Sequence, residues 1–354
     1  MKENPPTRRG ILSTVSAVFD PLGLIGPYIL QGKRILQNVC AEVKDWDEPL
    51  NDDTIQHWIS WKEQLRYLSN IKISRCYKAP NATGKVSSVE LHHFSDASTS
   101  GYGQCSYLRL VHEDGTVRVS LVMSKCRVTP LKRMTIPRLE LTAAMVSARI
   151  ARILREELKY PNLVEPFWSD SKVALGYISN ESRRFHVFVA NRVQTIHNLS
   201  EPTQWHYIAS EENPADIASR GSSVEELLDC DLWWQGPKFL SELIYKIEDY
   251  PPEPIHDTDV EVKRVRVQAT HVSVQTIPEM LKRYSSWSRA SRVLALCIVF
   301  SYKCRSWKIS GDLTTQDIDR AKKLMVKATQ HNQYKELDKL TRLDPVVDQD
   351  GLIR

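Results

Sequence analysis

Four carboxylates could do chemistry together because of where they fall between predicted elements. Asp96 comes at the end of a predicted first strand, and Asp170 directly follows a short fourth strand. Glu140 lies in the first turn of a long predicted helix, and Asp216 lies at the start of a short one. If the first and fourth strands are parallel neighbours, their ends bring Asp96 and Asp170 side by side, and the long helix can direct Glu140 to the same point.

Carboxylates so close repel one another, and each would have a raised pKa unless a cation compensates. A pair of divalent metal ions is the natural compensation, and ligands that are all oxygen favour Mg²⁺, with Mn²⁺ as the alternative. Two such ions support phosphodiester hydrolysis. The competing interpretation is that each acid only caps a helix or a turn, as Ser169-Asp170-Ser171 could do alone. Four acids in one element order are harder to explain in that way.

The elements that must position these acids alternate in a recognisable order. The pattern predicts an α/β fold, a mixed five-stranded sheet with flanking helices, plus helical N- and C-terminal segments. Asp114-Gly115 predicts a tight turn between the second and third strands. Strands are predicted at 89–94, 102–110, 117–125, 167–169 and 204–208, and helices at 53–68, 138–158, 172–178, 187–199, 278–303 and 314–339.

Composition narrows the class of protein. Among 354 residues, 48 Lys and Arg against 43 Asp and Glu leave a net charge of +5, which excludes a histone-like tail and an acidic disordered chain. The seven cysteines are spread widely without a Cys-x-x-Cys pair, which favours a reducing compartment over a disulfide framework. No apolar run is long enough to span a membrane. The apolar run at 11–19 is interrupted by hydroxyl residues, so secretion is not expected.

Four motifs around the acids resemble the ribonuclease H domain of Pao/BEL-type LTR retrotransposons. They are Phe94-Ser95-Asp96-Ala97-Ser98, Thr135-Ile136-Pro137-Arg138-Leu139-Glu140-Leu141, Trp168-Ser169-Asp170-Ser171 and Asn213-Pro214-Ala215-Asp216-Ile217-Ala218-Ser219-Arg220-Gly221. The resemblance implies a ribonuclease H-like fold and a catalytic, metal-binding set of Asp96, Glu140, Asp170 and Asp216. It also implies hydrolysis of the RNA strand of RNA–DNA hybrids with two Mg²⁺ ions, or Mn²⁺.

The flanking segments extend the resemblance to most of the chain. Residues 1–80 are similar to the C-terminal, thumb- or connection-like part of that family's reverse transcriptase, with Phe19-Asp20-Pro21-Leu22-Gly23-Leu24 interpreted as part of a buried apolar turn. The ribonuclease H-like domain would occupy 88–222, a linker 223–262, and a helical lead-in to a truncated integrase 263–354. The implied partners are an RNA–DNA hybrid and the polymerase and integrase of a polyprotein. The implied location is intracellular: cytoplasmic, in a virus-like particle, or nuclear.

Departures from the family pattern limit which of the family's activities and residue roles can be expected in this chain. The polymerase motif Tyr-x-Asp-Asp does not occur, and the loop 209–212 lacks the Pro-Gly common in relatives. His206 falls within a predicted strand, so it is given no proton-transfer role. The family has also been described as an aspartic peptidase, but neither Asp-Thr-Gly nor Asp-Ser-Gly occurs. A transposase-type nuclease would order its acids Asp, Asp, Glu, whereas Glu140 precedes Asp170. The remaining alternative is a catalytically silent or domesticated fragment that binds nucleic acid or a partner.

Basic residues near the acids suggest where a nucleic acid would bind. Residues 127–160 contain eight Lys and Arg against three Glu, and phosphate neutralisation by such residues dominates affinity for nucleic acids. The alternative is that the arginines of the long helix, Arg149 and Arg152 among them, form only its solvated face. The residues predicted to contact nucleic acid are Arg138, Arg183, Arg184, Asn191 and Arg192.

Overall fold

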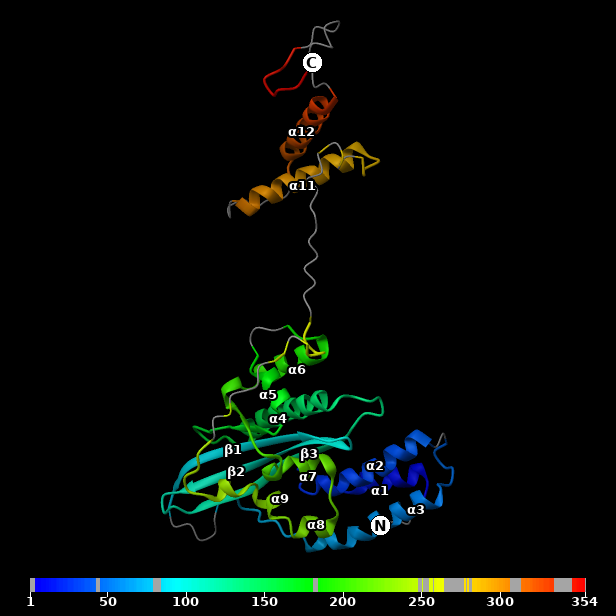
Figure 1. Ribbon diagram of the computed structural model, residues 1–354, viewed down its shortest axis with the longest axis vertical. Coiled ribbons are helices and arrows are strands. Elements are labelled where there is room, and N and C mark those ends of the chain that lie inside the picture. Colours follow the sequence, from blue (N-terminus) through cyan, green and yellow to red (C-terminus); the bar gives the residue numbers. More distant parts are fainter. Residues whose placement is uncertain are drawn as a thin grey trace. The chain divides into compact units, whose positions relative to one another are not determined.

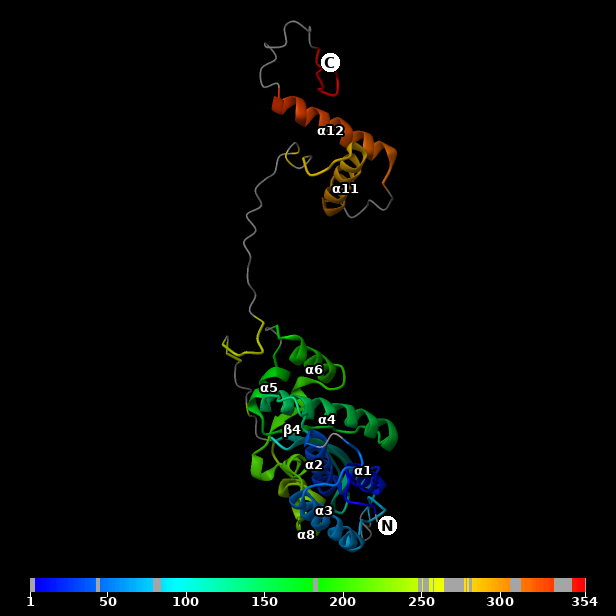
Figure 2. The ribbon, with the colours of Figure 1, turned by 90° about the vertical axis from the view of Figure 1, so that its right-hand side faces the viewer.

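The computed structural model divides the chain into two compact units, Met1–Arg264 and Val265–Arg354, which we describe separately (Figures 1 and 2). The described residues are 4–42, 45–78, 84–180, 184–247, 250, 255–256, 258–263, 277, 279, 282–305, 313–333 and 346–353.

A mixed five-stranded sheet organises the first unit. The strand order is β3-β2-β1-β4-β5. β1 pairs with β2 and β2 with β3 in antiparallel fashion, whereas β4 is parallel to both β1 and β5. Gly115 between β2 and β3 has a φ of +81°, which favours glycine at this turn. The predicted α/β fold is therefore confirmed. The strands are β1 Val86–Ala97, β2 Gly101–His112, β3 Val117–Val128, β4 Phe167–Ser169 and β5 Trp205–Tyr207.

Helices cover both faces of this sheet. α4 (Ile136–Leu158) packs Val146, Ile150 and Leu154 against Leu91 of β1 and its neighbours on β2. Pro137 suits the first turn of α4, and Lys159 ends it in the left-handed conformation. α5 (Lys172–Ile178) and α6 (Val187–His197) lie beside α4 in both views of the ribbon (Figures 1 and 2).

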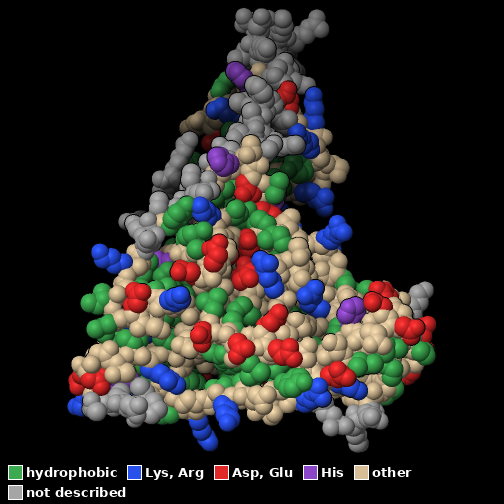
Figure 3. All heavy atoms as spheres, turned by 60° about the horizontal axis from the view of Figure 1, so that its bottom comes forward, with side chains coloured by type: hydrophobic (Ala, Val, Ile, Leu, Met, Phe, Trp, Pro, Cys, Tyr) green, Lys and Arg blue, Asp and Glu red, His purple; other side chains and the backbone are tan. Residues whose placement is uncertain are grey.

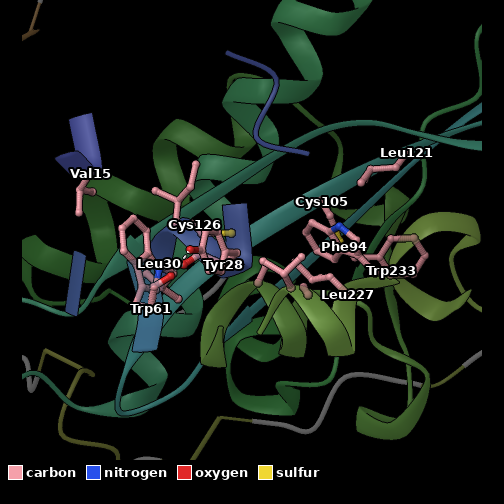
Figure 4. Packing of buried hydrophobic residues seen from close by; sticks show 14 of the residues in the cluster. Val15, Tyr28, Leu30, Trp61, Phe94, Cys105, Leu121, Cys126, Leu227 and Trp233 are labelled. Atoms are coloured by element: carbon pink, nitrogen blue, oxygen red, sulfur yellow. Dashed lines mark hydrogen bonds between the residues drawn. The ribbon is translucent and has the colours of Figure 1, made fainter. Parts of the chain in front are cut away.

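The opposite face is covered by helices from two distant parts of the sequence. Tyr28, Leu30 and Trp61 from the N-terminal segment join one apolar cluster with Phe94 of β1 and Trp233 (Figure 4). The helices are α1 Arg8–Ala17, α2 Gly26–Glu42, α3 Asp52–Gln64, η1 Leu65–Asn70, α7 Ala215–Arg220, α8 Val224–Leu228, α9 Asp231–Gln235 and η4 Lys238–Ser241, with further short turns η2 Pro202–Gln204 and η3 Ser210–Glu212 elsewhere in the unit.

The segment before α2 differs from its prediction as a buried apolar turn. Phe19 is 90% exposed and Leu22 is 43% exposed. The turn is instead held by Asp20, whose carboxylate accepts the backbone N–H groups of Leu24 and Ile25 at 2.9 and 3.0 Å. Polar contacts at the start of α2 therefore shape this turn, and its largest apolar side chain points to solvent.

The segment predicted as a linker over 223–262 contains α8, α9 and η4. Leu227, Trp233 and Leu240 are fully buried. The Tyr107 hydroxyl donates to the Trp233 carbonyl at 2.7 Å, and the Trp233 indole donates to the Leu24 carbonyl at 2.9 Å. The apolar residues of this segment complete the core below the sheet, so residues 224–241 belong to the folded unit.

Two helices of the second unit pack against each other. α11 (Trp287–Arg305) and α12 (Thr315–Gln333) bury Ala290, Leu294 and Met325 between them. The predicted helices at 278–303 and 314–339 correspond to these, except that α11 begins later and residues 334–339 lie outside the described residues. Across the described part of the chain, no helix is long and apolar enough to cross a membrane.

Candidate active site

The ends of β1 and β4 place two of the predicted acids side by side. β1 and β4 are parallel, and Ser95 faces Ser169 across the pair. Asp96 directly follows Ser95, and Asp170 directly follows Ser169. Neighbouring strands lie about 4.8 Å apart. The parallel pairing of β1 and β4, on which the expected side-by-side placement of these acids depends, is present in the structure.

Asp96 is a buried carboxylate, with only 5% of the residue exposed. Its oxygen accepts a hydrogen bond of 2.5 Å from the hydroxyl of Ser219, which α7 supplies. Burial, followed by repulsion from Asp170, raises the pKa of Asp96 to about 6, although the Ser219 hydrogen bond acts in the opposite direction. Folding thus holds this carboxyl where its charge is unfavourable.

Glu140 reaches the same place from α4. Because α4 begins at Ile136, Glu140 lies in its second turn and not, as predicted, in its first. Its carboxylate accepts a hydrogen bond of 2.5 Å from the Ser171 hydroxyl. Burial, with further repulsion from Asp170 and Asp96, raises the pKa of Glu140 to about 7. Three carboxylates therefore act on one another through their charges.

The other two acids have more polar surroundings. Asp170 accepts hydrogen bonds from the Ser210 hydroxyl at 2.6 Å and from the Asn213 amide at 3.4 Å. Asp216 lies in α7 and forms an ion pair with Arg220 at 2.6 Å, with its side chain one-third exposed. Asp216 is thus the member of the set that has a cation of its own.

The donor set has the chemistry that divalent metal ions prefer, although it is not gathered as a ready metal site. Among the described residues, Asp96, Glu140 and Asp170 have no ion pair with Lys or Arg. Within the same residues, no three His, Cys, Asp or Glu side chains are gathered around one point. Asp96, Glu140 and Asp170 each accept a hydrogen bond from a different hydroxyl group. An oxygen-only set without a compensating cation suits Mg²⁺ or Mn²⁺.

Polar residues that were not predicted from the sequence hold the acids. Asn213 is fully buried, and its amide donates to the Ser95 carbonyl at 3.2 Å as well as to Asp170. Its side-chain oxygen accepts the Ala215 N–H at 3.1 Å, so one residue ties β1 to the start of α7. Ser171, Asn213 and Ser219 lie within the quoted motifs, and that proximity to the acids was the available signal. Ser210 had no such signal.

Two of the predicted nucleic-acid contacts are engaged inside the protein. Arg138 forms a two-pronged pair with the buried Glu261, at 2.5 and 3.1 Å. The guanidinium of Arg192 stacks 3.4 Å above the Phe188 ring and donates to the Thr142 hydroxyl at 2.9 Å. Their positive charge is therefore directed at groups within the fold.

The other predicted contacts lie around α6. Arg184 and Asn191 are exposed, and the Arg184 carbonyl accepts the N–H of Lys263 at 2.7 Å. Arg183 lies outside the described residues. His206 is in β5 with its ring 5.2 Å from that of Trp168.

The N-terminal part of the chain is similar to a known family. Residues 7–171 match the family model described as Pao retrotransposon-like RNaseH-like domain. The match covers a little under half of the 354 residues. The match includes Asp96, Glu140 and Asp170 and ends before Asp216. The ribonuclease H-like fold predicted for the sheet and its helices is thereby confirmed.

Solved structures similar to this Pao-like chain include ribonucleases H. The N-terminal RNase H domain of rv2228c from Mycobacterium tuberculosis, a fusion with maltose-binding protein, is 13% identical, with 40% of this chain and 95% of that chain covered and a TM-score of 0.26. RNase H1 from Halobacterium salinarum is 14% identical over 40% and 97%, with a TM-score of 0.26. The foamy viral protease-reverse transcriptase in complex with double-stranded DNA is 11% identical over 58% and 35%, with a TM-score of 0.23. No curated protein matches the chain. Scores this low leave the site to be argued from its own residues.

Proposed function

We propose that this Pao-like protein is a metal-dependent ribonuclease H that hydrolyses the RNA strand of RNA–DNA hybrids. The observation that carries the proposal is the set of buried and half-buried carboxylates Asp96, Glu140 and Asp170, which form no ion pair with a Lys or Arg among the described residues. A structural role for such a set would be costly, because buried charges without partners destabilise a fold. A functional role explains why the cost is tolerated.

The residues have distinct tasks in the proposed reaction. Asp96, Glu140, Asp170 and Asp216 would hold two Mg²⁺ ions, with Mn²⁺ as a substitute. When bound, the ions supply the positive charge that activates a water molecule and stabilises the leaving oxygen of the phosphodiester. Ser219 and Ser171 orient the carboxylates of Asp96 and Glu140 through their hydroxyl groups.

Asn213 is a positioning residue in the same proposal. Its contacts with the Ser95 carbonyl, Asp170 and the Ala215 N–H hold the end of β1 and the beginning of α7 at a constant separation. Asp216 is carried by α7, so Asn213 sets where the fourth acid stands relative to the other three.

The same proposal places the chain within a retroelement polyprotein. Residues 1–80 would be the end of a reverse transcriptase, and 263–354 the lead-in to an integrase, with polymerase and integrase as partners. The site would then work in the cytoplasm, within a virus-like particle, or in the nucleus.

The test is cleavage of a hybrid that carries a label on its RNA strand. We expect the full chain to cut the RNA strand with Mg²⁺ and to lose this activity with a chelator. Outer-shell partners of metals are worth about 10–100-fold, so Asp96→Asn and Asp170→Asn should each lose at least about a hundredfold. Glu225→Gln, an exposed acid in the first turn of α8, is the matched control and should stay active.

Two outcomes would contradict the proposal. Full activity in either site variant would remove these acids from the reaction. Hybrid binding without any cleavage by the wild-type chain would instead favour the silent fragment.

A further inference from the structure

A set of positive charges lies at the end of the sheet where the acids are found. Lys125 and Arg127 are exposed side chains near the end of β3, and Lys33 is an exposed side chain of α2 with Arg34 next to it. We call these four residues the basic track. None of them was among the predicted nucleic-acid contacts, although Arg127 began the basic stretch of sequence.

The register of the sheet places the track beside the acids. Arg127 faces Tyr102 on β2, and Tyr102 faces Ala97, the neighbour of Asp96 on β1. Since strands are about 4.8 Å apart, β3 lies about 10 Å from β1 at this level. Lys125 is one side-chain step back along the same face of β3. The track and the acids thus lie at the same end of the sheet. Lys125 and Arg127 project from the face opposite Asp96, because Asp96 is aligned through Gly103 with Cys126, which lies between them.

α2 continues the track towards the helix that carries Asp216. α2, β3 and α7 all approach Gly101 closely. A Cβ at this position would lie 2.7 Å from the Ser219 carbonyl of α7, 2.8 Å from the Arg127 carbonyl of β3 and 3.0 Å from the Leu30 side chain of α2. The Arg34 guanidinium donates to the Arg220 carbonyl at 3.3 Å. The Gln37 amide donates to the Thr129 carbonyl at 2.5 Å. These contacts fix α2 against both neighbours.

The cations of the track act on one another and form no salt bridge with an acid. Among the described residues, Lys33, Lys125 and Arg127 form no ion pair. Burial and the charges of Lys125 and Arg127 lower the pKa of Lys33, whereas the nearby Cys126 and Asp20 act to raise it. Arg138 and Arg192, in contrast, are engaged by Glu261 and Phe188.

Figure 3 shows the distribution of charge on one face of the molecule. On this face, Lys and Arg side chains are spread among acidic and apolar ones and form no single patch.

We propose that the basic track binds the phosphate backbone of the nucleic acid whose RNA strand is cut at the acids. This inference rests on the proposed function. Phosphates fit because cations that repel one another gain most from a row of anions, and such contacts position a nucleic acid without reading its bases. The track then fixes the direction in which the hybrid leaves the site, over β3 and α2.

The experiment compares charge removal on the track with charge removal on α4. The full chain carries Asp96→Asn throughout, so that binding of a fluorescent hybrid is measured without cleavage. The track variant is Lys125→Gln with Arg127→Gln, and Lys33→Gln tests the part on α2. The control is Arg149→Gln with Arg152→Gln, which removes the same charge from exposed positions of α4. The dissociation constant is measured at several salt concentrations, after thermal unfolding shows that all variants are folded.

Each phosphate contact contributes about 0.9 to the slope of log affinity against log salt. We expect the slope to fall by about 0.9 for each track residue removed, with weaker binding at low salt. The control pair should keep the slope of its parent.

Several outcomes would overturn the inference. Equal losses in the track variant and the α4 control would show only an effect of net charge, and an unchanged slope in the track variant would exclude phosphate contacts there. Displacement by polyglutamate as readily as by unlabelled hybrid would indicate an acidic protein partner instead. If the track variant behaves as expected while the wild-type chain never cuts the hybrid, the proposed function fails and the track stands.

Discussion

Two carboxylates on β1 have pKa values that are shifted in opposite directions. Glu90 and Asp96 lie on the same face of β1, since side chains alternate along a strand. Glu90 accepts hydrogen bonds from Arg109 at 2.7 Å and from the Tyr245 hydroxyl at 2.8 Å. Burial acts to raise the pKa of Glu90, but the bonds from His92 and Tyr245 and the charge of Arg109 outweigh it and lower the pKa. Burial and the repulsion by Asp170 raise that of Asp96.

The difference separates a structural charge from a functional one. Arg109 is 2% exposed and also donates to the carbonyls of Leu240 and Glu242, at 2.8 and 2.5 Å. The Arg109 guanidinium therefore holds η4 and the residue that follows it against the sheet. Asp96 has a hydroxyl partner and no such cation. A buried acid whose neutralising charge is missing from the described protein is where we expect an ion from outside.

The largest expected effect is on stability at the Glu90 end of β1. Arg109→Met leaves the Glu90 carboxylate buried without its cation, which typically costs about 3–5 kcal/mol. Urea unfolding measures this loss. Adding Glu90→Gln to Arg109→Met should restore a good part of it, because no uncompensated charge is left. A loss below about 1 kcal/mol in the single variant would mean that the pair does not stabilise the fold.

A smaller effect should appear in the dependence of stability on pH. The pKa of Asp96 is raised from 3.8 to about 6 in the folded chain. The stability that its protonated form contributes is complete below about pH 4 and is lost as the pH rises to about 6. In a metal-free buffer, the free energy of unfolding of Asp96→Asn, measured by urea unfolding, should therefore rise relative to that of the wild type. The expected rise between pH 4 and 7 is on the order of 2 kcal/mol.

The comparison with Glu90 fixes the sign of that measurement. Because the pKa of Glu90 is lowered, Glu90→Gln should be less stable than the wild type at neutral pH, with the deficit shrinking as the pH falls below about 4.5. Burial lowers the pKa of His92 to about 4, and the hydrogen bond with Glu90 acts in the opposite direction. Glu90→Gln therefore also changes the titration of His92, so the two variants are compared above about pH 5. Parallel curves for the two variants would contradict the contrast between the two acids.

Much of the fold follows from local patterns in the sequence. The positions of the strands and of α4 along the chain follow from residue alternation and helical spacing. The placement of Asp96 beside Asp170 follows once β1 and β4 are parallel neighbours. The start of α4 shifts by two residues because Pro137 belongs inside its first turn. That shift moves Glu140 to the second turn without taking it from the acids.

What could not be predicted depends on contacts between distant residues. Arg138 pairs with Glu261, 123 positions away, and no local pattern reveals that this charge is already neutralised. Trp233 is buried against β2 and the N-terminal segment, contacts that no local pattern in the predicted linker 223–262 reveals. The hydroxyl groups of Ser210 and Ser219 reach their acids only once η3 and α7 are in place.

The most direct test of the account is a calorimetric titration with Mn²⁺, used as a probe for the proposed Mg²⁺ site. We expect the full-length wild-type chain to bind Mn²⁺ and Glu90→Gln to bind it equally well. Asp96→Asn and Asp170→Asn should lose this binding while remaining folded. Unchanged Mn²⁺ binding in either site variant, or no binding by the wild type, would contradict the claim that these carboxylates bind a divalent metal ion.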